Sequence, residues 1–195
     1  VADKLTWLYK PHEYWEVILP LTVLKRFDEV LSDTKEKVLE EAKKYPETFA
    51  QRDMLLKKAS WQKFYNISKY DFKKLLDDPE NIEANLYNYI NGYSTEVKDI
   101  MEKFWFETHI KRMAEGKVLF SVIETFNSKN ANLHPTEVSN IEMGYIFEEL
   151  VRKFSESYDE QAGAHFTARD IINLMAELLI GDDEARLEEE GIIAT

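Results

Sequence analysis

The sequence predicts an all-α, multi-helix domain. Apolar residues recur at helical spacing along most of the 195-residue chain. Only six glycines and five prolines interrupt this pattern, which is typical of helices joined by short turns. Hydrophobic residues make up 44% of the chain and aromatic residues 13%, enough to form one sizeable core.

Two helical segments are predicted at the start of the chain, over Leu5–Tyr9 and His12–Lys44, the second open to interruption near Ser32. Pro20 lies inside the second segment. Proline lacks a backbone donor, so we expect a kink there unless a new helix begins.

The segment from Gln51 to Leu75 combines positive charge with aromatic residues. It has seven basic and two acidic residues, a local balance of +5. The interleaved aromatic residues are Trp61, Phe64, Tyr65, Tyr70 and Phe72. One interpretation is a patch that faces nucleic acid or an acidic partner. The other is a loop-rich stretch with its aromatic rings inward and its lysines solvated.

A sharp helix start is predicted at Asp78-Pro79-Glu80, because an N-cap residue is followed by proline and an acidic first turn. That helix should stop at Gly92. Further helices are predicted over Thr95–Phe104, Thr108–Ala114, Lys117–Phe126, Thr136–Tyr158 and Thr167–Ile180.

The start of the last helix is the strongest clue to function. Residues 163–170 form a glycine-containing turn, in which Thr167 is placed as N-cap and Asp170 puts a carboxylate in the first turn. Such a turn leaves backbone N–H groups able to hold an anionic group of a ligand. The same pattern also occurs in ordinary capped helices, so both interpretations stay open at this point. The apolar stripe that follows is Ile171, Ile172, Leu174, Met175, Leu178 and Leu179.

An amphipathic helix is predicted upstream of this turn, and the two motifs occur in the same order as in a known protein family. The helix contains Gly144, Tyr145, Phe147, Glu148 and Leu150, and the later turn contains Gly163, Phe166, Thr167 and Arg169. Together they resemble the G-Y-x-x-E-x-L helix and the G-x-x-F/Y-T-P-R turn of the modification subunit of type I restriction-modification systems. The segment from Tyr14 to Asp28 is similar to that family's opening helix pair.

The resemblance implies an adenine-N6 DNA methyltransferase that uses S-adenosylmethionine. The family's cofactor-binding segment corresponds to Ala164, His165, Phe166, Thr167, Ala168 and Arg169. Thr167 and the neighbouring N–H groups would hold the methionine carboxylate, Phe166 would pack near the cofactor, and Arg169 would give electrostatic support. The family usually has proline where this chain has Ala168, which keeps the helix but loses rigidity.

The end of the chain corresponds to the start of that family's α/β methyltransferase domain. An acidic stretch over 182–190 predicts a short solvated helix, and Ile192–Thr195 predicts the beginning of a strand. The family's glycine-rich loop and Asn-Pro-Pro-aromatic motif do not occur in this sequence. We therefore expect a helical N-terminal domain over 1–160, the truncated first segment of the methyltransferase domain over 161–195, and no catalytic residue.

Other chemistry has little support. The chain has no cysteine, and His12, His109, His134 and His165 lack metal-ligand spacing, so no metal site is predicted. No 18-residue apolar run or signal peptide is visible, and a soluble, cytoplasmic protein is expected. The net charge of −12 predicts weak binding to duplex DNA by the chain alone.

The resemblance also implies partners: the specificity subunit, a second modification subunit, the restriction subunit, and duplex DNA in the assembled complex. The domain would support DNA enclosure and subunit assembly. The alternative is a helical adaptor that binds a protein partner without any cofactor, which the acidic balance and the missing catalytic motif favour.

Overall fold

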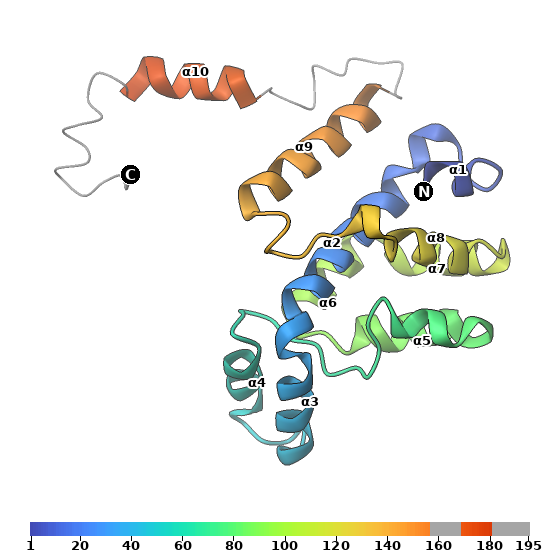
Figure 1. The fold of residues 1–195 in the computed structure, drawn as a ribbon, viewed down its shortest axis with the longest axis vertical. Coiled ribbons are helices and arrows are strands. Elements are labelled where there is room, and N and C mark those ends of the chain that lie inside the picture. Colours follow the sequence, from blue (N-terminus) through green and yellow to red (C-terminus); the bar gives the residue numbers. More distant parts are fainter. Residues whose placement is uncertain (157–168, 181–195) are drawn as a thin grey trace. The chain divides into compact units, whose positions relative to one another are not determined.

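The structure is a computed structural model that describes residues 1–156 and 169–180, and helices dominate it (Figure 1). Within these residues no β-strand forms, and a single antiparallel bridge pairs Asn66 with Tyr93. The all-α prediction is confirmed. The chain divides into two compact units, residues 1–150 and 151–195. The α-helices are α1 (Ala2–Leu5), α2 (Trp15–Leu31), α3 (Lys35–Lys44), α4 (Arg52–Ser60), α5 (Ile82–Asn91), α6 (Thr95–Lys103), α7 (Phe106–Glu115), α8 (Leu119–Phe126), α9 (Asn140–Glu156) and α10 (Arg169–Ile180).

The predicted helices are largely found, with two differences near the start of the chain. Helix α1 ends at Leu5, where the first predicted helix was to begin. Lys10, which precedes a proline, adopts an extended conformation before the next helical turn over Pro11–Glu13. Helices α2 and α3 are separated by a 3-10 turn over Ser32–Thr34, as predicted. Pro20 lies inside α2, which continues through it as one helix.

Helix α4 lies within residues 51–75, where the sequence pattern predicted no helix. It packs against α3, and the two lie side by side in Figure 1. A small cluster of Val38, Leu56 and Tyr65 holds this pair together. Only Leu56 and Ser60 are buried on α4. Its apolar stripe is therefore weak, and the sequence gives little sign of a helix there.

The main core lies between α2, α5, α6, α7 and α8. Helix α2 contributes Val17, Leu21 and Leu24, all fully buried, and Leu86 and Ile110 come from α5 and α7. Because α2 is buried along most of its length, it acts as the central element on which the other helices pack.

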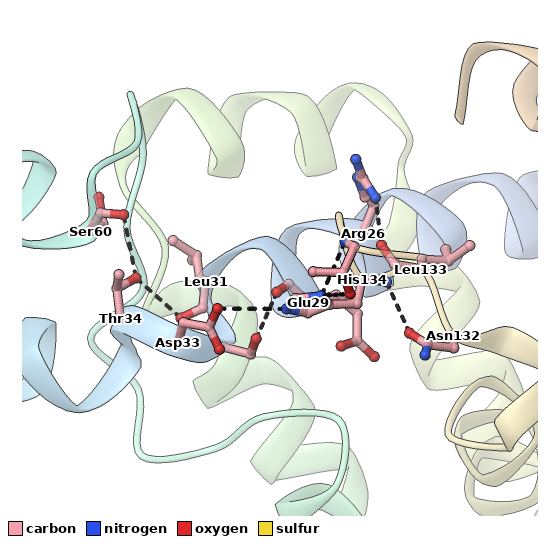
Figure 2. A network of polar contacts seen from close by, with 11 residues as sticks. Arg26, Glu29, Leu31, Asp33, Thr34, Ser60, Asn132, Leu133 and His134 are labelled. Carbon is pink, nitrogen blue, oxygen red and sulfur yellow. Dashed lines mark hydrogen bonds and ion pairs between the residues drawn. The ribbon is translucent and has the colours of Figure 1, made fainter. Parts of the chain in front are cut away.

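Arg26, on α2, holds the loop that precedes α9 through three hydrogen bonds. Its Nη1 donates to the carbonyl oxygens of Leu133 (2.6 Å) and Val138 (2.7 Å), and Nη2 donates to Asn140 Oδ1 at 2.9 Å. Figure 2 shows Arg26 with Leu133, and it also shows a second contact, in which His134 Nε2 lies 3.8 Å from Asp33 Oδ2. The loop before α9 is therefore held by a guanidinium group that is itself buried.

A close backbone approach occurs at Gly92, the C-cap of α5. The Ile67 N–H donates to the Gly92 carbonyl at 2.8 Å. A β-carbon built on Gly92 would lie 2.6 Å from the Ser68 nitrogen and 2.7 Å from Asn66 Oδ1. Glycine is required here by space, since the backbone itself is right-handed helical.

Gly92→Ala should lower the free energy of unfolding by about 1–3 kcal/mol, because the methyl group meets backbone that cannot move aside. Gly116→Ala is the matched control. Its β-carbon would lie 2.8 Å from Leu8 Cδ2, the flexible end of a side chain, so its cost should be smaller. Urea denaturation of both variants measures the difference. Equal losses would show that the contact with Ser68 is not restrictive.

Candidate functional site

Most of the predicted cofactor segment lies outside the described residues. This applies to Ala164, His165, Phe166, Thr167 and Ala168, so their role stays a prediction. Arg169 is the first residue of α10, and Asp170 lies in its first turn. The predicted helix up to Ile180 is thus found, whereas the predicted capping by Thr167 is not tested.

Helix α10 presents an apolar stripe to solvent. Ile171, Ile172, Leu174 and Met175 are each half-exposed or more, and Leu178 is 78% exposed. An exposed stripe of this size on a regular helix is typical of a surface that another element covers. The stripe is the part of the predicted turn-and-helix segment that the structure describes in detail.

Helix α9 carries the other motif of the resemblance and lines a groove. Its lining includes Met143, Gly144 and Phe147 from α9, together with Phe27 and Phe64. The groove has a volume of about 460 Å³, which lies within the range of ligand pockets. Its surface is mainly apolar, with polar groups from Gln62, Asn140 and Arg26.

Tyr145 does not face this groove and is 51% exposed. Ile141, one turn earlier on α9, is 67% exposed. The motif residues are therefore distributed between a groove-lining face and an outer face of the helix, and they do not form one site in residues 140–150.

The basic and aromatic segment is mostly structural. Phe72 and Tyr65 are buried, and Phe64 and Tyr70 pack against the main core. Lys57 pairs with Asp53 at 2.8 Å and Glu96 at 2.5 Å. The interpretation with inward rings thus holds for four of the five aromatic residues.

Trp61 is the exception among these aromatic residues. It ends α4 in the left-handed conformation, with φ of 55°, and its side chain is 76% exposed. Such a backbone conformation is rare for a bulky residue. Lys37 Nζ lies 4.9 Å from the centre of the indole ring. No sequence signal separates this residue from the buried aromatics around it.

A buried polar cluster joins α2, α3 and α5. Asp28 accepts hydrogen bonds from Tyr89 Oη (2.9 Å) and the Phe72 N–H (3.2 Å). Burial raises the pKa of Asp28 to about 6. Burial likewise lowers the pKa of Lys35 to about 8, and Lys35 donates to Asn66 Oδ1 at 3.1 Å. Both shifts have the direction that desolvation of a charge produces.

A polar pocket of 330 Å³ opens beside this cluster. Its lining balances four lysines against four carboxylates, which gives it no net preference for an anion or a cation. These residues are Lys25, Lys35, Lys73, Lys74, Asp28, Glu29, Glu36 and Asp71. The cluster is best explained as a structural junction.

Asp28 gives the fold a measurable pH dependence. Because the folded state raises its pKa from 3.8 to about 6, the folded protein binds this proton more tightly than the unfolded chain. The stability contribution is therefore complete below pH 4 and is lost as the pH rises through 6. Relative to Asp28→Asn, the wild type should lose up to about 3 kcal/mol over this range. Urea denaturation at several pH values measures the difference, and a constant offset would contradict the shift.

Metal chemistry finds no support in the described part of the chain, where no group of three or more potential ligands is close enough to hold an ion. His109 packs against the Tyr9 ring, with ring centres 5.7 Å apart, and its Nε2 lies 3.5 Å from Glu16 Oε2. His109 is therefore partly buried. His134 makes a local hydrogen bond with Thr136, between Nδ1 and Oγ1 at 2.8 Å.

Among the described residues, no helix has the length and apolar character needed to cross a membrane. No curated protein and no solved structure matches the chain significantly. A family model does match it: the HsdM N-terminal domain, over residues 1–126. This match covers helices α1 to α8 and the whole main core. The chain therefore belongs to the HsdM N-terminal domain family, the N-terminal domain of modification subunits in type I restriction-modification systems.

Proposed function

We propose that this chain serves as the N-terminal domain of a type I DNA adenine-N6 methyltransferase subunit, where it supports DNA enclosure and subunit assembly in the cytoplasm. The family match over residues 1–126 carries the proposal. The exposed stripe on α10 supports it, because such a stripe suits packing against a following catalytic domain.

The cofactor would be held at the turn before α10. S-adenosylmethionine supplies the methyl group that the parent enzyme transfers to an adenine flipped out of the duplex. In this chain, the segment Ala164–Arg169 would bind the methionine carboxylate through backbone N–H groups and the Thr167 hydroxyl. Phe166 would exclude water beside the cofactor, and Arg169 would add positive charge at the helix start.

The partners would be a specificity subunit, a second modification subunit and, in the full complex, a restriction subunit. Duplex DNA would be bound by the assembly. Because the net charge of this chain is −12, the chain alone would bind duplex DNA only weakly.

A cofactor-free helical adaptor is the second candidate, favoured by the acidic balance of the chain and by the apolar face of α10. The gene downstream of Thr195 distinguishes the two. A glycine-rich loop within about 20 codons and a later Asn-Pro-Pro-aromatic motif support the methyltransferase, whereas a natural stop codon there supports the adaptor.

The isolated chain should transfer no methyl group to DNA, because it lacks the Asn-Pro-Pro-aromatic motif that would hold the adenine amino group. Incubation with DNA and S-adenosylmethionine carrying a labelled methyl group measures this. The parent subunit with its specificity partner is the positive control. Label in DNA above the enzyme-free background would refute the prediction.

Thr167→Ala in the parent subunit should affect two assays differently. Loss of the cap should cost about 1 kcal/mol of stability. Loss of a hydrogen bond to a charged group should cost roughly 1.5–3 kcal/mol of binding, which lowers S-adenosylmethionine affinity about tenfold or more. Thr167→Ser keeps the hydroxyl and should retain most of both.

Isothermal titration of the wild type and both variants, at a temperature where all are folded, measures the affinity. Reduced stability with unchanged affinity in Thr167→Ala would mean that Thr167 only starts a helix.

A further inference from the structure

Trp61 is exposed at a cost in backbone free energy. Its left-handed conformation is one that glycine or asparagine usually occupies after a helix. Burial of the side chain offsets little of this cost, since 76% of it is exposed. A strained residue whose side chain points to solvent suggests a role outside the fold.

The surroundings of Trp61 are basic. Within four residues on either side, the chain has Lys57, Lys58 and Lys63 and no carboxylate. Lys58 and Lys63 are exposed and take part in none of the ion pairs of the described residues. Lys37, from α3, places its ammonium group over the indole ring.

Trp105 shows that exposure and strain alone do not produce this surface. Its φ is 53° and its side chain is 78% exposed, nearly the same as Trp61. Within four residues, however, it has Glu102, Glu107 and a single lysine, Lys103. The basic charge is therefore specific to the surface around Trp61.

We propose that Trp61 with Lys37, Lys58 and Lys63 binds a nucleic-acid strand, with an unpaired base stacked on the indole. Nucleic acid offers phosphates for the lysines and flat base faces for the ring in the same ligand. This inference rests on the proposed function, since a base-flipping methyltransferase creates unpaired bases in its substrate.

The test uses the 195-residue chain and a fluorescein-labelled single-stranded oligodeoxynucleotide of about 12 residues, within the site sizes of known single-strand binders. Fluorescence anisotropy at roughly 50 mM salt should detect binding, since low salt strengthens phosphate contacts. Trp61→Ala should weaken binding about tenfold, whereas Trp61→Phe should retain most of it. Trp105→Ala is the matched control and should leave the affinity unchanged.

The lysines are tested through salt dependence. Lys58→Gln and Lys63→Gln should each lower the slope of log affinity against log salt by about 0.7, the value for one phosphate contact on a single strand. Thermal melting of every variant verifies that it is folded. A Trp61→Ala variant that is folded and binds like the wild type overturns the proposal.

Three further results would also overturn it: equal loss in Trp105→Ala, no binding by the wild type, or competition by poly-glutamate as effective as that by unlabelled oligonucleotide. The last would indicate an acidic protein partner. These results leave the proposed function standing. That function fails if the assembled parent complex binds DNA equally well without residues 1–150, a result that would overturn the nucleic-acid proposal with it.

Discussion

The segment that connects α4 to α5 is not helical along much of its length, and side chains there form hydrogen bonds with backbone groups that a helix would otherwise pair. Asn66 is the central one: its Nδ2 donates to the Tyr89 carbonyl at 2.9 Å, and its Oδ1 accepts from the Ser68 N–H at 2.7 Å. Ser60 Oγ similarly donates to the Phe64 carbonyl. Buried backbone groups without such partners would cost free energy comparable to a lost hydrogen bond. This crossing segment positions both the buried Phe72 and the exposed Trp61, so the core and the surface depend on the same set of contacts.

The sequence predicted elements wherever strong local signals were present. Asp78-Pro79 and Gly92 mark the limits of the segment that contains α5, and the interruption near Ser32 was also predicted. Helix α4 was missed because only Leu56 and Ser60 are buried along it, and its helical structure depends on packing against α3. Tertiary contact, rather than periodicity, determines such short helices.

The candidate surfaces were harder to predict. Nothing in the residues around Trp61 indicates a left-handed backbone, because tryptophan seldom adopts one. The raised pKa of Asp28 likewise arises from burial among residues distant in sequence, and the hydrogen bond from Tyr89, 61 positions away, opposes part of that rise. Recognition of the family, in contrast, needed only motif order along the chain, and the match over residues 1–126 supports it independently.

The anchoring of α9 has a consequence for the order of folding during synthesis. Arg26 bonds to groups that follow it by 107 to 114 residues, whereas α3 and α4 pair through neighbours close in the chain. Contacts between distant residues form only after the intervening chain has been made and its loop closed. As the ribosome extends the chain, the helices up to Phe126 can pack around α2 first. The Arg26 guanidinium can bond to Leu133 and Asn140 only after these residues have left the ribosome, so the loop before α9 is fixed later than the helices around α2.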